Sequence, residues 1–127
     1  MLKGLRVLVA DDDTGTCLSV SSLLREHGMR TDWTNYGKEA LIRAKEALNS
    51  GDRFGAYIID WMMSDLNGIE TVRRLREFVG EDVPVVIISA HDWTDIEKEA
   101  LEAGVTAFCA KPLFISELID VFADNIR

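Results

Sequence analysis

The chain has 127 residues, of which 47% are hydrophobic and 28% charged, and its formal net charge at pH 7 is −8. This length suits one domain filling residues 1–127, and the apolar content excludes a disordered chain. The acidic balance argues against nonspecific nucleic-acid binding, which needs a lysine- and arginine-rich surface.

No apolar run approaches the ~20 residues that span a bilayer, and no signal-peptide pattern opens the chain. We therefore expect a cytoplasmic protein with no membrane contact through this domain. The two cysteines, Cys17 and Cys109, lie far apart and form no CxxC motif. They are predicted to be reduced, buried residues of a reducing compartment.

Five short runs rich in apolar and β-branched residues predict strands. They occupy residues 6–10 (RVLVA), 30–34 (RTDWT), 56–59 (AYII), 85–89 (VVIIS) and 105–110 (VTAFCA). The first, third and fourth are almost continuously apolar, as in strands that are covered on both faces. The second is the most polar and is predicted to lie at an edge of the sheet.

Between and after these runs, apolar residues recur at the spacing of one helix face. The stripes are Val20, Leu23 and Leu24; Ala40, Leu41, Ala44, Ala47 and Leu48; Ile69, Val72, Leu75 and Val79; Ile96, Ala100 and Leu101; and Ile115, Leu118, Ile119, Phe122 and Ile126. Capping patterns predict helix starts near Asp13, near Asn67 with Glu70, and near Thr94 with Glu97. Strand and helix thus alternate five times, which predicts an α/β fold of type (βα)5. Its parallel five-stranded sheet is doubly wound, with helices on both faces.

Polar side chains stand where the predicted strands end. They are Asp11, Asp12 and Asp13 after the first strand, Asp60 after the third, Ser89 at the end of the fourth, and Lys111 after the fifth. Because the carboxyl ends of parallel strands meet at one edge, where such sheets bind ligands, we expect these side chains to surround one crevice.

This set of side chains has a coherent chemistry. Clustered carboxylates repel one another unless a cation joins them, and oxygen ligands favour a hard ion such as Mg²⁺. A carboxylate beside Mg²⁺, with lysine and serine donors nearby, resembles a phosphoryl-transfer site that forms an aspartyl phosphate. Asp60, single and central, is the predicted nucleophile, and Asp11 and Asp12 are the predicted metal ligands.

Each residue alone has a simpler explanation. The acidic run at 11–13 could cap a helix, which we retain for Asp13, and Lys111 could be a surface charge. Ser89 could satisfy the backbone, and Asp65 is interpreted as a loop acid before the third helix. The joint placement after separate strands is what favours a site.

The segments VLVADDD, IIDWMMSDLNG, VVIISA and FCAKPLF, in this order, resemble the receiver domain of two-component response regulators, the CheY-like fold. The resemblance covers essentially the whole chain and implies the flavodoxin-like strand order 2-1-3-4-5. It also implies phosphorelay signal transduction, in which a histidine kinase or a histidine phosphotransfer domain phosphorylates the receiver in a Mg²⁺-dependent reaction. Phosphorylation then changes the face formed by the fourth helix, fifth strand and fifth helix.

The opening LKGLRVLVADDD further resembles the receiver segment of hybrid sensor histidine kinases, so covalently linked kinase domains or a separate downstream protein are the expected partners. Such a domain is not an enzyme on external substrates. It catalyses only its own phosphorylation and dephosphorylation.

The resemblance also assigns residue roles. It makes Asp60 the phosphoacceptor and assigns metal binding to Asp11, Asp12, Asp60 and the backbone carbonyl of Met62. Ser89 and Lys111 contact the phosphoryl group, and Ser89 and Phe108 act as switch residues. The bond before Pro112 is expected to be cis.

Several positions depart from the family pattern. Ser64 stands where the family commonly has proline, which predicts a looser loop, and Phe108 lacks the hydroxyl of a tyrosine. Met62 and His91 occupy positions that tune dephosphorylation, and the apolar Met62 is predicted to exclude water and lengthen the phosphorylated lifetime. Trp61 and Trp93 are expected to flank the site.

Three other functions fit the sequence less well. A hydrolase of the haloacid dehalogenase type would need a second aspartate two residues after Asp60, where the chain has Met62. A flavodoxin-like FMN site around residues 14–16 would place the FMN phosphate beside the acidic run at 11–13. A receiver-like interaction module that is never phosphorylated would not need the acidic, serine and lysine set that this chain retains.

Overall fold

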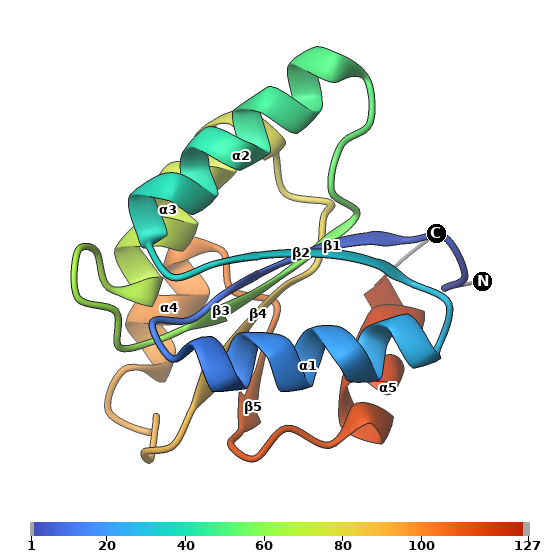
Figure 1. Cartoon of the computed structure of the whole chain (residues 1–127). Helices are drawn as coiled ribbons and strands as arrows, with labels where there is room; N and C mark the ends of the chain where they lie inside the picture. The colour runs from blue at the N-terminus through green and yellow to red at the C-terminus, as the bar shows by residue number, and fades with distance from the viewer. Residues whose placement is uncertain (1, 126–127) are drawn as a thin grey trace.

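Strands and helices alternate along the whole chain in the computed structural model, which describes residues 2–125 (Figure 1). The elements are β1 (Arg6–Ala10), α1 (Thr14–Glu26), β2 (Arg30–Thr34), α2 (Gly37–Ser50), β3 (Ala56–Asp60), α3 (Gly68–Val79), β4 (Val85–Ser89), α4 (Glu97–Ala103), β5 (Ala107–Ala110) and α5 (Ile115–Asn125). Ile126, the last member of the fifth predicted stripe, lies outside the described residues. The predicted (βα)5 alternation is confirmed.

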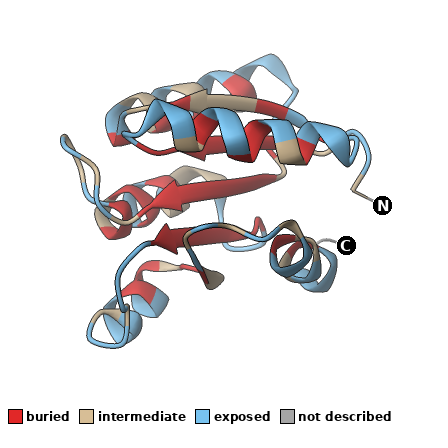
Figure 2. Ribbon diagram, turned by 60° about the horizontal axis from the view of Figure 1, so that its bottom comes forward, coloured by how far each residue is buried: buried red, intermediate tan, exposed pale blue. Residues whose placement is uncertain are grey.

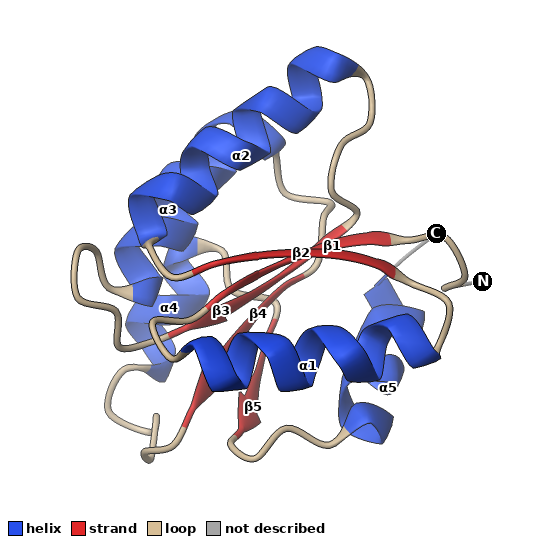
Figure 3. Cartoon of the chain, in the orientation of Figure 1, coloured by secondary structure: helices blue, strands red, loops and turns tan. Residues whose placement is uncertain are grey.

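The five strands form one parallel sheet in the order β2-β1-β3-β4-β5 (Figure 3). This order and the doubly wound α/β class confirm the prediction, and the polar strand β2 does lie at an edge. Helices α2, α3 and α4 cover one face of the sheet, and α1 and α5 cover the other.

Burial on both faces explains the unbroken apolar character of the central strands. In β3, Tyr57 and Ile59 enter the core beneath α2, α3 and α4, whereas Ala56 and Ile58 enter the core beneath α1 and α5. Figure 2 shows the central strands as buried almost throughout, between helices whose outer sides are exposed.

Two strand boundaries differ from those predicted. β3 extends by one residue because Asp60 pairs with Ile88 of β4. β5 begins at residue 107 instead of 105. The amide of Val105 bonds to the carbonyl of Ala100 at the end of α4, so this residue still belongs to the turn. The next residue, Thr106, also precedes the ladder, and its Oγ1 accepts the amide of Val85.

Two of the three predicted helix starts are confirmed. The Asp13 side chain accepts the amide of Gly15 at the start of α1, and Asn67 accepts the amide of Glu70 at the start of α3. The start predicted at Thr94 is wrong. Thr94 instead donates both its amide and its hydroxyl to Asp92 Oδ1, which holds it in a turn, and α4 begins three residues later.

Both cysteines are unpaired and buried, as predicted. Burial raises the pKa of Cys17 and of Cys109 to about 11, so both thiols stay protonated at neutral pH. Among the described residues, none of the helices has the length and apolarity that a membrane span requires.

Candidate functional site

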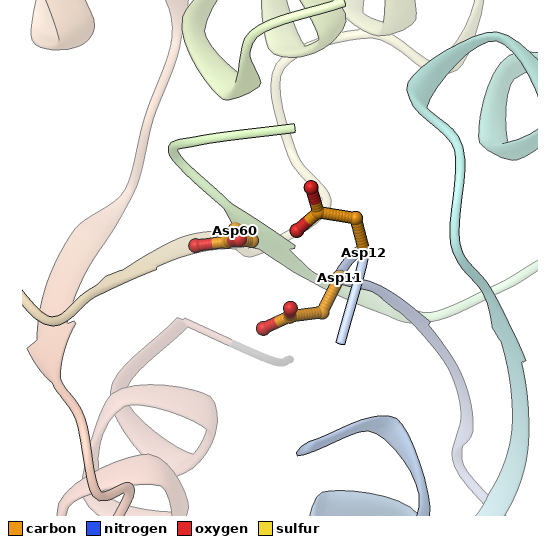
Figure 4. A group of neighbouring side chains, drawn as sticks. All are labelled: Asp11, Asp12 and Asp60. Carbon is orange, nitrogen blue, oxygen red and sulfur yellow. The ribbon is translucent and has the colours of Figure 1, made fainter. Parts of the chain in front are cut away.

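Three carboxyl groups meet at the carboxyl end of the sheet. Asp11 and Asp12 follow β1 and Asp60 ends the neighbouring strand β3, and one oxygen of each lies within 4.8 Å of the others (Figure 4). Asp11 and Asp60 are buried, whereas Asp12 is exposed. The structure therefore brings together the acidic residues that the sequence singled out.

Lys111, just after β5, reaches into the same cluster. Its Nζ lies 2.8 Å from Asp11 Oδ2 and 3.2 Å from Asp60 Oδ1. The peptide bond between Lys111 and Pro112 is cis, as predicted. Burial opposes the charged amine, but the hydrogen bonds and charges of the two carboxylates outweigh it and raise the pKa of Lys111. The Lys111 amine is therefore charged at neutral pH.

Asp11 is held from several sides. Its Oδ1 accepts the amide of Asp13 at 2.9 Å, and its own amide donates to the carbonyl of Thr34 at 3.1 Å. Its carbonyl accepts Asn35 Nδ2 at 2.8 Å and the Cys17 thiol at 3.2 Å. Asn35 is not among the site residues predicted from the sequence, because nothing in the polar turn after β2 indicates a contact with the end of β1.

The electrostatics of Asp60 are unusual for a carboxylate. Burial and the negative charge of Asp11 raise its pKa to about 6, although Lys111 opposes this shift. With all groups ionised, the cluster carries three negative charges and one positive charge. This excess favours binding of a cation.

The donor set fits a small divalent cation. Asp11 Oδ2 is buried, and the ion pair with Lys111 Nζ at 2.8 Å is its only polar contact within the described part of the chain. The three carboxylates offer only oxygen ligands, and the exposed side of Asp12 leaves room for water. These are the features that Mg²⁺ prefers over softer metals.

Ser89 lies at the end of β4 and is only 2% exposed. Its hydroxyl accepts the amide of His91 at 3.0 Å and donates to the carbonyl of His91 at 3.1 Å. In the β4–β5 ladder, Ser89 pairs with Ala110, the residue before Lys111. The serine therefore lies beside the end of β5. The hydroxyl is thus engaged by the loop that follows β4.

Two further predicted positions lie after β3 and on β5. Met62, two residues after Asp60, is 57% exposed. Phe108 is half-buried in β5, and its ring stacks on that of Trp93 with centroids 5.3 Å apart and an interplanar angle of 12°. The sequence placed Trp93 beside the site but not against Phe108.

Asp65 has a structural role that the sequence did not reveal. Its two carboxylate oxygens accept the amides of Gly37 and Lys38 at 2.9 and 3.0 Å, so it caps the start of α2. The residue that precedes this helix, Tyr36, provides no side-chain cap of its own. The loop after Asp60, which contains Ser64 in place of proline, is therefore anchored to α2 through Asp65.

Gly37 allows this close approach between α2 and the loop. A Cβ atom at this position would lie 2.6 Å from Thr71 Oγ1 and 3.0 Å from Leu66 Cβ. Any larger residue would push the helix start away from Asp65.

Comparisons with known proteins agree on one family. The family model described as "Response regulator receiver domain" matches residues 7–123. The transcriptional regulatory protein ZraR of Klebsiella oxytoca is 33% identical over 112 residues, which cover 88% of this chain and 24% of ZraR. The chain spans about a quarter to a half of the length of the curated relatives it matches.

Solved structures are similar over nearly the whole chain. The receiver domain of the Francisella response regulator 1452 has 35% sequence identity and a TM-score of 0.78, with 95% of both chains covered. The receiver domain of the histidine kinase CKI1 from Arabidopsis thaliana, complexed with Mg²⁺ and BeF₃⁻, has 26% identity and a TM-score of 0.81. The match covers 97% of this chain and 90% of that one.

Proposed function

Because this chain belongs to the response regulator receiver domain family, and is thus a receiver domain of two-component signalling, we propose that Asp60 is its phosphoacceptor. The observation that carries this assignment is the meeting of Asp60 with two acidic side chains and Lys111 at the end of a central strand. Asp60 is the one carboxylate of the cluster that is supplied by β3.

The proposed reaction moves a phosphoryl group from a histidine ring nitrogen to a carboxylate oxygen of Asp60. The phosphorus–nitrogen bond breaks and its electron pair stays on the imidazole, while a phosphorus–oxygen bond forms. Lys111, already 3.2 Å from Asp60 Oδ1, would donate to a phosphoryl oxygen. Ser89 would turn from His91 toward the same group and so report that phosphorylation has occurred.

The cation that fits this site is Mg²⁺, held by Asp11, Asp12, Asp60 and the backbone carbonyl of Met62. Bound there, it would neutralise charge on the transferring phosphoryl group. The similar CKI1 receiver, complexed with Mg²⁺ and a phosphoryl-like fluoride, supports this assignment.

Turnover of external substrates is not part of the proposal. The side chain two residues after Asp60 is the thioether of Met62, which cannot act as the acid or base that a phosphatase of the haloacid dehalogenase type requires. The domain would catalyse only its own phosphorylation and dephosphorylation.

The proposed donor is the phosphohistidine of a cytoplasmic histidine kinase or histidine phosphotransfer domain. The proposed output is a change in the face formed by α4, β5 and α5. This face would signal to kinase domains on the same chain or to a separate protein. Its predicted switch residues, Ser89 and Phe108, lie on β4 and β5.

Asp60→Asn is the direct test. Wild-type protein incubated with acetyl phosphate and Mg²⁺ should gain the mass of one phosphoryl group, and EDTA should prevent the gain. Asp60→Asn should gain none, whereas the control Asp120→Asn, which removes an exposed acid on α5, should match the wild type. A labelled Asp60→Asn protein would refute the assignment.

A further inference from the structure

The loop between β4 and α4 is held against the sheet by few side chains. Between residues 90 and 96, only Trp93 and Ile96 are partly buried, and the others are exposed. Trp93 makes the more specific contact, since its ring lies nearly parallel to that of Phe108 on β5. An offset aromatic pair of this kind adds stability beyond the area that it buries.

The same loop holds the hydroxyl of Ser89. Both hydrogen bonds of this hydroxyl go to the backbone of His91, two residues before Trp93. Turning the hydroxyl toward a phosphoryl group on Asp60 would break both bonds. After that, the stack with Phe108 would be the main specific contact that keeps the loop in place.

The loop is also continuous with α4. The carbonyl of Trp93 accepts the amide of Ile96, and the carbonyl of Ile96 accepts the amide of Ala100 inside the helix. The side chain of Ile96 provides no cap, so the backbone turn that starts at Trp93 sets where α4 begins. A movement of the Trp93 ring would therefore reach α4 directly.

We propose that Trp93 is a positioning residue of the switch, which stabilises the resting state by stacking on Phe108 and thereby opposes release of Ser89 from His91. The proposal rests on the function proposed above, and adds to it a residue outside the acidic cluster. A ligand shifts such an equilibrium only by its preference for one state. Because the switch, as proposed, separates Trp93 from Phe108, removing their contact must increase the apparent affinity for a phosphoryl analogue.

The test compares affinities for beryllium fluoride at fixed Mg²⁺, measured by calorimetry. Trp93→Ala and Trp93→Leu should each bind about two- to tenfold more tightly than the wild type, a factor that corresponds to the loss of one aromatic pair. Trp93→Phe, which keeps an aromatic face, should stay close to the wild type. Leucine retains apolar bulk and provides a folded variant if alanine disrupts the loop.

A double-mutant cycle shows whether Trp93 acts through Phe108. Phe108→Ala should also bind more tightly, and the double variant with Trp93→Ala should gain little beyond either single change. Additive gains would mean that Trp93 acts elsewhere, and unchanged or weaker binding by Trp93→Leu would overturn the proposal. Failure of the wild type to bind, or retained binding by Asp60→Asn, would instead count against the proposed function.

Discussion

Asp65 offers the sharpest test of how the loop after Asp60 is held. Its carboxylate accepts two amides at the start of α2, from Gly37 and Lys38. Gly37 is buried, so its amide would lose its partner and find little water if the carboxylate were removed. We expect Asp65→Ala to lower stability more than an ordinary surface substitution would.

The size of the effect follows from the two bonds. Loss of a helix-capping side chain costs about 0.5–2 kcal/mol, and a carboxylate that caps two amides belongs near the upper end. We therefore expect a loss of about 2 kcal/mol for Asp65→Ala and about 1 kcal/mol for Asp65→Asn, which keeps one acceptor oxygen. For a chain of this size, these losses lower the Tm by roughly 3 to 10 °C.

The pH dependence has a definite sign. Burial raises the pKa of Asp65, but the amides of Lys38 and Gly37 outweigh it, so the folded-state pKa lies below the ordinary value of 3.8. The carboxylate therefore stabilises the fold fully above pH 3.8, and this contribution is lost as the pH falls through the folded-state pKa. The difference between the wild type and Asp65→Asn should thus shrink in acid.

Thermal unfolding followed by circular dichroism, in EDTA at pH 7, measures the loss. Asp120→Asn is the matched control, because it removes the same charge from an exposed position on α5. If Asp65→Asn and Asp65→Ala unfold at the temperature of Asp120→Asn, the cap contributes nothing and the reasoning is wrong.

Three more predictions concern the site and its support. Asp60→Asn should stabilise the metal-free protein at pH 7. The folded-state pKa of Asp60 is about 6, so the stability of the wild type falls as the pH rises from 3.8 to 6. Equal urea midpoints of the two proteins in EDTA would contradict this. Met62→Asn should shorten the phosphorylated half-life by admitting water beside Asp60, and an unchanged rate of phosphoryl loss would exclude that role. Arg76→Ala should lower the unfolding free energy by about 2–4 kcal/mol in urea titrations. The Arg76 guanidinium donates to backbone carbonyls that follow α3, precede β4 and follow α4. A loss smaller than that of an exposed arginine variant would contradict the prediction.

Much of the architecture could be predicted because it depends on short-range periodicity. Apolar periodicity shows which sides of β1, β3, β4 and the helices must be buried. The alternation of strands and helices then leaves few possible topologies. Convergence of Asp11, Asp60 and Lys111 followed from the same topology, since the carboxyl ends of parallel strands share one edge. Strand order itself came from the family resemblance and not from the pattern.

Other features could not be predicted from local patterns. Thr94 matched a capping pattern, yet Asp92, two residues before it, offered a nearer acceptor and held it in a turn. Asn35 gave no sign that it would bond to the carbonyl of Asp11, 24 residues earlier. In both cases the outcome depended on which polar groups the folded chain brought within reach.

The sequence by itself determined the alternation of strands and helices, the two-sided burial of the sheet, and the identity of the acidic groups at its carboxyl end. Tertiary structure alone decided that Asp65 caps a helix 28 residues earlier in the chain, and that Trp93 stacks on Phe108. The physical reason is the separation along the sequence between the groups that interact. Periodicity records which side of an element is buried, whereas hydrogen bonds and ring contacts between loops exist only after those elements have packed.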